Sequence, residues 1–278
     1  MKALYHKSIT IDKLYQTFSS IFTNETAPTR EHLIDFLMSV ISLNRFQSVL
    51  YNYDHFIKDV SDFKLKSYYY ALNESQLDIN DWLTAMVRTA ISLIPDCIKK
   101  QAVILSVDDT MVEKYGDHFE CCSVLFDHAA HNGSSYLNGH CFVSIMLCVP
   151  VIRNGKILYN AIPLGYKMWN KEKSKIELAA EMVSKIMPEL SKKRQVILLF
   201  DSWYAKSEMT SLVNKFQNLN IICNVRSDTV LYDFPPIKTG KRGRPAKHVK
   251  KLSIYEDFSL SANKIGEYFI GYREVLTN

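Results

Sequence analysis

The chain has 278 residues, of which 47% are hydrophobic and 23% charged, and its formal net charge is +5. This composition is typical of a globular protein with a sizeable core, and the length favours one large domain plus a smaller one. No apolar stretch reaches membrane-spanning length, and the first residues lack the apolar core of a signal peptide. The six cysteines show no framework spacing, which argues against a disulfide-stapled secreted domain and favours reduced thiols in a cytoplasmic protein.

Residues 1–100 carry the spacing of amphipathic helices. Apolar side chains recur at intervals of three and four residues from Ile11 to Phe22, from Leu33 to Ile41 and from Leu83 to Ile94. Pro28 marks a plausible helix start and Pro95 a helix end. We predict a small helical N-terminal domain over residues 1–100 and consider it a candidate for DNA binding.

A basic and aromatic stretch inside this region allows two interpretations. It comprises Lys64, Lys66, Tyr68, Tyr69 and Tyr70. Contact with nucleic acid is one interpretation. A half-exposed helix face explains the same residues equally well, and we favour it.

Two apolar runs without polar alternation, residues 102–107 and 196–200, predict strands that are buried on both faces. Asp108 follows the first run and Asp201 the second. An aspartate at a strand end is often only a turn former or a helix N-cap. The presence of two such aspartates raises the alternative that they form a site for a hard cation such as Mg²⁺ or Mn²⁺.

The segments between the two runs predict how the strands are connected. Residues 141–152 and 156–162 form strand patterns joined by Asn154-Gly155, a strong hairpin turn signal. Helical spacing follows over 176–187, then the second apolar run, a helix over 209–216 and a strand over 220–225. One helix between strands returns the chain parallel to the first strand. We therefore predict an α/β fold with Asp108 and Asp201 at the ends of adjacent parallel strands, where ligands bind in such sheets.

Residues 238–251 hold seven cationic side chains and no acidic one. Their charge exceeds the net charge of the whole chain, and Gly240, Gly243 and Pro245 interrupt regular structure. A solvated charged loop is the simpler interpretation. We favour a basic arm that binds DNA phosphates or enters a minor groove through Lys241, Arg242, Arg244 and Lys247.

Histidines and cysteines gather between residues 118 and 141. The group comprises His118, Cys121, Cys122, His128, His131, His140 and Cys141. These spacings do not match known structural zinc sites, so we assign no metal to the group.

Three motifs resemble those of DDE-type transposases from bacterial insertion sequences. Asp108-Asp109-Thr110 with Lys114 and Gly116 resembles their first catalytic block. Residues 196–204, ending in Asp201-Ser202-Trp203-Tyr204, are similar to the second block, and the arm resembles part of a β-rich insertion. The resemblance implies an RNase H-like mixed sheet with flanking helices over residues 101–230, preceded by the helical domain. Residues 231–278 would then hold the basic arm and part of the insertion.

The resemblance also implies roles for individual residues. Asp108 and Asp201 would be the first two catalytic carboxylates and ligands of Mg²⁺ or Mn²⁺, with Asp109 the second choice for the first position. Lys114 and the four cations of the arm would contact DNA. The implied activity is cleavage and transfer of DNA strands by two metal ions about 3.5–4 Å apart. The implied partners are transposon ends and target DNA, bound by a homo-oligomer in the nucleoid without membrane contact.

The third acidic residue of the family has no counterpart in its expected pattern. That pattern is Tyr-x-x-Arg-x-x-x-Glu, and Tyr272-Arg273-Glu274 does not match its spacing. We therefore expect a truncated or fragmentary transposase that binds DNA with little or no cleavage. The alternatives are another RNase H-like nuclease and a non-catalytic DNA-binding remnant of a transposase.

Overall fold

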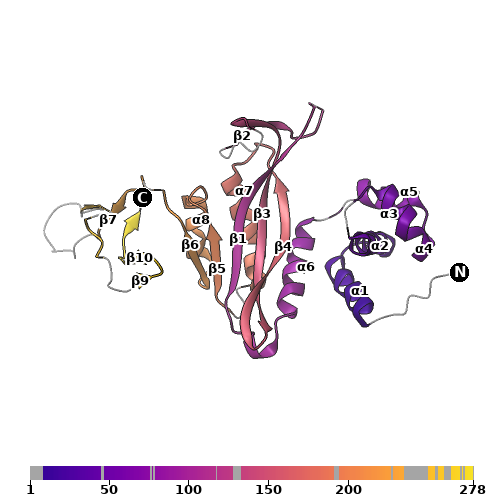
Figure 1. Cartoon of the computed structure of the whole chain (residues 1–278), viewed down its shortest axis with the longest axis horizontal. Helices are drawn as coiled ribbons and strands as arrows, with labels where there is room; N and C mark the ends of the chain where they lie inside the picture. Colours follow the sequence, from indigo (N-terminus) through magenta and orange to yellow (C-terminus); the bar gives the residue numbers. More distant parts are fainter. Residues whose placement is uncertain are drawn as a thin grey trace. The chain divides into compact units, whose positions relative to one another are not determined.

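The computed structural model describes residues 9–44, 47–75, 77, 79–116, 118–127, 133–190, 194–226, 228–234, 250–253, 256–259, 264–269, 271 and 273–277. The contacts between residues divide the chain into two compact units, Met1–Cys223 and Asn224–Asn278. The first unit contains a helical segment and a mixed sheet (Figure 1). The predicted division at residues 100 and 230 remains a prediction.

The three predicted N-terminal helices are confirmed, and the structure adds shorter ones between them. Thr26 caps the second helix, because its hydroxyl accepts a hydrogen bond from the Thr29 amide, and Asn44 ends that helix in a left-handed conformation. The helical elements are α1 (Ile9–Ile21), α2 (Ala27–Leu43), α3 (Val49–Asn52), the π-helical turn η1 (Tyr53–Ile57), α4 (Lys58–Val60), α5 (Leu65–Asn73), α6 (Ile79–Ser92) and the 3-10 turn η2 (Asp96–Ile98).

The basic and aromatic stretch forms α5, which is half exposed. Tyr68 is completely buried, and its hydroxyl donates to Asp35 at 2.7 Å. Tyr69 and Tyr70 are exposed. Packing thus accounts for Tyr68, as the structural interpretation of this stretch predicted.

The described strands β1 to β6 form one mixed sheet. β3 pairs antiparallel with β1, β2 and β4, whereas β5 lies parallel to both β1 and β6. Figure 1 shows β4, β3, β1, β5 and β6 side by side in that order. The predicted α/β fold, with an RNase H-like sheet and flanking helices, is confirmed. The strands are β1 (Val103–Glu113), β2 (Ser123–Phe126), β3 (Tyr136–Arg153), β4 (Lys156–Met168), β5 (Val196–Phe200) and β6 (Leu219–Cys223).

The predicted hairpin joins β3 to β4. Asn154 and Gly155 both have positive φ, at 52° and 72°, and Arg153 pairs with Lys156 across the turn. These are the conformations that a two-residue primed turn requires and that Asn-Gly adopts at low cost.

Helices cover one face of the sheet. α7 (Lys175–Leu190) packs there against α6 and the strands, as Met182, Val183 and Ile186 join Val87 and Leu105 in one buried core. A capping box starts α7, in which Ser174 and Glu177 exchange side-chain to amide hydrogen bonds of 2.7 and 3.1 Å. The prediction of a single helix over 209–216 is wrong. The segment forms two short helices, α8 (Ser207–Thr210) and α9 (Leu212–Lys215), which are separated at Ser211.

The described part of the chain contains neither disulfide bonds nor membrane-spanning helices. All six cysteines lie within it and are free thiols. Among the described residues, no helix combines the length and the apolar character that crossing a bilayer requires.

The second unit contains short strands. β7 (Leu231–Tyr232) pairs with β8 (Lys251–Leu252) and β11 (Leu276–Thr277), and β9 (Lys264–Ile265) pairs with β10 (Tyr268–Phe269). Lys241, Arg242, Arg244 and Lys247 of the predicted arm lie outside the described residues.

Candidate active site

Asp108 lies in the middle of β1, not at its end. We predicted that the strand stops at Val107, but β1 continues to Glu113 because Asp108 to Glu113 pair with Ser144 to Gly139 of β3. Alternation along the strand puts Val103, Leu105 and Val107 on the face that α6 and α7 cover. Asp108 therefore points to the opposite face and is exposed.

Asp201 follows the last residue of β5 and closes a turn. Its Oδ1 accepts hydrogen bonds from the amides of Trp203 at 3.0 Å and Tyr204 at 3.4 Å. Asp201 thus fills the turn-forming role that we weighed as the alternative to catalysis. The turn also fixes the orientation of its carboxylate.

The structure brings Asp108 and Asp201 together across neighbouring parallel strands. β1 pairs with β5 up to Ser106 and Leu199, and each aspartate stands two residues beyond that pair, Asp108 within β1 and Asp201 just after the end of β5. Both continue the alternation of residues that face away from α6 and α7. The predicted adjacency of the two strands is confirmed.

The carboxyl group of Asp108 has a pKa above its ordinary value. Although the side chain reaches solvent, neighbouring protein atoms partly desolvate the carboxyl group, which is the main cause, and the negative charges of Asp109 and Asp201 add to it. A hydrogen bond of 2.8 Å from the Asp109 amide to Asp108 Oδ1 and the charge of Lys175 act in the opposite direction. A bound cation would relieve this excess of negative charge.

Asp109 occupies the face of β1 opposite to Asp108. Its Oδ2 accepts from Lys175 Nζ at 2.7 Å and from Cys141 Sγ at 3.4 Å. Its Oδ1 accepts from the Tyr204 hydroxyl at 3.2 Å. Burial raises the pKa of Tyr204 and raises that of Cys141 to about 12, so both remain protonated donors near neutral pH.

Two indole rings surround the ammonium group of Lys175. Nζ lies 5.7 Å from the ring centre of Trp169 and 5.6 Å from that of Trp203. These are cation–π distances, and they hold the lysine beside Asp109.

The donor set of this site fits a hard divalent cation in part. Asp108 and Asp201 offer carboxylate oxygens on one face of the sheet, which is the ligand type that Mg²⁺ and Mn²⁺ prefer. Within the described ranges, however, no three His, Cys, Asp or Glu side chains come together so that they could hold a metal ion. The site therefore offers two carboxylates as candidate ligands, and the family's third acid, for which the sequence shows no counterpart, does not join them among the described residues.

Lys114 does not join the two acids. It follows the end of β1, six residues beyond Asp108, which corresponds to about 20 Å along an extended strand. Its amide donates to Asn138 O at 2.8 Å, and its ammonium lies 5.5 Å from the ring centre of Phe119.

The histidine and cysteine group is dispersed. His140 contacts the carbonyl oxygen of Glu120 at 2.8 Å, and Cys141 bonds to Asp109. His128 and His131 lie outside the described residues. The described members of the group form no metal site.

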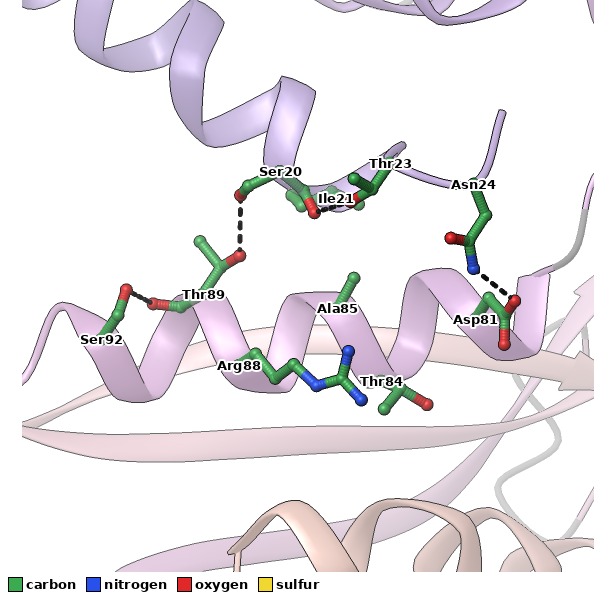
Figure 2. Close-up of a pocket in the computed structure, with 10 residues that line it drawn as sticks. All are labelled: Ser20, Ile21, Thr23, Asn24, Asp81, Thr84, Ala85, Arg88, Thr89 and Ser92. Carbon is green, nitrogen blue, oxygen red and sulfur yellow. Dashed lines mark hydrogen bonds between the residues drawn. The ribbon is translucent and has the colours of Figure 1, made fainter. Parts of the chain in front are cut away.

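A groove of about 500 Å³ lies elsewhere, between α1 and α6 (Figure 2). Hydrogen bonds bridge it from Ser20 to Thr89 at 3.1 Å and from Asn24 to Asp81 at 2.7 Å. Neither candidate acid lines it. The groove is therefore separate from the candidate active site.

Comparison with known families identifies the group to which this protein belongs. The model of the DDE superfamily endonucleases matches residues 14–264, which is most of the chain. The chain belongs to this family. A search of curated proteins gave no match.

Membership fits a transposase or nuclease that acts on DNA, and endonucleases of this family use divalent metal ions. The matched range of this DDE superfamily endonuclease includes Asp108 and Asp201.

Sequence reasoning missed the contacts around Asp109. We considered Asp109 only as a second choice for catalysis, and assigned nothing to Lys175, Trp169 or Tyr204. The sequence contains no clear signal for them, because the run over residues 102–107 is apolar at nearly every position. The alternation that places Asp109 on the covered face of the sheet appears only in the burial of the folded strand.

Proposed function

We propose that this DDE superfamily endonuclease is a DNA transposase that cleaves DNA strands and joins them to new positions. The observation that carries the proposal is the placement of Asp108 and Asp201 on neighbouring parallel strands of an RNase H-like sheet. The proposed substrates are transposon ends and target DNA, bound by more than one copy of the chain.

Asp108 and Asp201 are the proposed ligands of Mg²⁺ or Mn²⁺. When bound, such ions activate the attacking oxygen and stabilise the departing one in phosphodiester chemistry. The Trp203 and Tyr204 amides orient Asp201, while the β1–β3 pairing and the Ser144 hydroxyl, which donates to the Asp108 carbonyl at 3.0 Å, hold the strand that carries Asp108. The carboxylate of Asp201 and the backbone that carries Asp108 are therefore both held in place before a cation arrives.

Lys241, Arg242, Arg244 and Lys247 are the proposed contacts to the DNA backbone, together with Lys114. Their charge supports the proposal, because cations that neutralise phosphates supply most of the affinity of a protein for DNA. Lys114 lies far enough from Asp108 along β1 that it would contact a different part of the duplex.

A second candidate function is DNA binding without cleavage. The grouping of two acids, and not three, among the described residues favours it. Loss of a metal-positioning ligand disturbs the geometry of the reacting groups, and such misplacement lowers rates steeply.

Incubation of the whole chain with Mn²⁺ or Mg²⁺ and DNA that contains the ends of its element tests these functions. A transposase nicks the DNA at the ends and yields joined products, and both disappear in Asp108→Asn and Asp201→Asn. Asp96→Asn is the control, because the Asp96 side chain is 88% exposed and lies in the η2 turn.

Each other outcome has one meaning. Nicking without joined products indicates a nuclease. Binding without nicking indicates the non-cleaving function, and nicking that survives in both aspartate variants contradicts the assigned site.

A further inference from the structure

Asp109 connects four elements of the first unit on the covered face of the sheet. The residue itself belongs to β1, Cys141 to β3, Lys175 to the first position of α7, and Tyr204 to the turn after β5. All three partners donate to its carboxylate, at 3.4, 2.7 and 3.2 Å respectively. A single side chain thus joins the strand, the helix and the turn.

The surroundings of this carboxylate leave it little freedom. The side chains of Asp109 and Lys175 are 16% and 19% exposed, and Tyr204 is completely buried. Trp203 also contacts Lys175 through its ring, so two consecutive residues of the turn are held. The Asp109 carboxylate resists displacement, because moving it away from Lys175 would leave both charges unpaired and largely shielded from water.

Both ends of this connection adjoin a proposed metal ligand. Asp109 directly follows Asp108, and its side chain points to the opposite face of the same strand. Tyr204 donates through its amide to Asp201 and through its hydroxyl to Asp109. The hydrogen bonds of Tyr204 therefore link the carboxylate of Asp201 with the side chain of Asp109, the residue that directly follows Asp108.

We propose that Asp109, Tyr204 and Lys175 form a positioning tie, which sets the separation of Asp108 and Asp201 from the far side of the sheet. The proposal rests on the proposed function, and it assigns Asp109 a supporting role and not a place among the metal ligands. Mg²⁺ requires nearly ideal octahedral geometry, whereas Ca²⁺ accepts longer and more variable distances. Loosening the tie should therefore weaken Mg²⁺ binding more than Ca²⁺ binding.

Titration calorimetry of the whole chain with each metal, in the absence of DNA, tests the tie. Tyr204→Phe removes only the hydroxyl. We expect about a tenfold loss of Mg²⁺ affinity, as for other groups that orient metal ligands, with a smaller loss for Ca²⁺. Asp109→Asn should also give a partial loss, whereas Asp201→Asn should abolish Mg²⁺ binding.

Tyr68→Phe is the matched control. Tyr68 is completely buried and donates to an aspartate, as Tyr204 does, but it lies in the helical segment. Both variants lose a hydrogen bond from a tyrosine hydroxyl to an aspartate, and Tyr68→Phe also loses the contact with the Ser61 hydroxyl at 2.9 Å. Both should melt at lower temperatures than the unchanged protein, yet only Tyr204→Phe should change the ratio of Mg²⁺ to Ca²⁺ affinity.

The outcomes separate the tie from the proposed function. Unchanged Mg²⁺ binding in Tyr204→Phe, or an equal loss in Tyr68→Phe, overturns the tie while Asp201 remains a ligand. Complete loss in Asp109→Asn makes Asp109 a ligand and also overturns it. Absence of Mg²⁺ binding by the unchanged protein contradicts the proposed metal site as well as the tie.

Discussion

Asp108 and Asp109 are neighbours in the sequence, but they face opposite sides of β1 and have different surroundings. Asp109 has three donors, one of them cationic. Asp108 accepts the Asp109 amide and lies near the charge of Asp201. The charge of Asp109 is thus balanced by its donors, whereas Asp108 has fewer such partners, which supports the proposal that Asp108 is the cation ligand.

The raised pKa of Asp108 predicts that Asp108→Asn stabilises the metal-free protein at neutral pH. A raised pKa means that the folded state binds the proton more tightly than the unfolded chain. Stability therefore falls as pH rises from the ordinary value of about 3.9 through the raised value. The amide has no charge and keeps an oxygen that can accept from Asp109.

Thermal unfolding in the presence of a chelator measures this effect. Asp108→Asn should melt at a higher temperature than the unchanged protein at pH 7, and the difference should shrink toward pH 4. The highly exposed Asp96 again provides the control, because Asp96→Asn should leave the melting temperature almost unchanged. A lower melting temperature for Asp108→Asn at pH 7 would show that burial and repulsion do not dominate at this position.

At the scale of elements, α7 contacts the candidate site through Lys175, its first residue, which pairs with Asp109 on the covered face of the sheet. Its capping box fixes where the helix begins, and therefore where Lys175 meets Asp109. A cation in the first turn is unfavourable to the helix dipole, and the ion pair with Asp109 offsets this cost.

We expect Ser174→Ala to lower the free energy of unfolding by about 1 kcal/mol, because it removes the hydroxyl that accepts from the Glu177 amide. Urea denaturation measures the change. Ser92→Ala is the control. Ser92 is the last residue of α6, and its hydroxyl donates to the Thr89 carbonyl, so this substitution should change the free energy of unfolding by less than about 0.5 kcal/mol. Equal effects of the two substitutions would argue against the capping role.

The elements that sequence reasoning found are those with strong local signals. The apolar run before Asp201, the Asn154-Gly155 turn and the apolar spacing of α2, α6 and α7 each specify an element without distant partners. The second half of β1 has no such signal, because Asp108, Asp109 and Thr110 form a strand only through pairing with β3. The break at Ser211 likewise has no strong signal in the sequence.

The candidate site likewise has a part that the sequence predicts and a part that it does not. The two acids followed from strand ends and motif order, whereas the contacts of Asp109 with Lys175 and Tyr204 join residues 66 and 95 positions apart. Only the strand register and the position of α7 bring these residues together. Tertiary contacts of this kind leave no periodic signal along the chain.

At the scale of the whole molecule, the positive charge of the 238–251 segment predicts its contribution to DNA binding. Replacing Lys241, Arg242, Arg244 and Lys247 with alanine should flatten the slope of log affinity against log salt by about three units, because each neutralised phosphate releases counterions. Fluorescence anisotropy with a labelled duplex at several salt concentrations measures the slope.

A matched variant removes four exposed lysines of the first unit. These are Lys99, Lys100, Lys185 and Lys215. Their replacement should change the slope by less than one unit. If both variants change the slope equally, the segment acts through net charge alone and is not a specific DNA-binding arm.

The response of thermal stability to Mn²⁺ and Mg²⁺ tests the central claim most directly, namely that Asp108 and Asp201 together hold the divalent metal. Metal at about ten times its dissociation constant should stabilise the folded chain by about 1.4 kcal/mol and raise the melting temperature. The rise should be absent in Asp108→Asn and in Asp201→Asn, and should persist in Asp96→Asn. A metal-induced rise of the same size in Asp201→Asn would contradict the assignment.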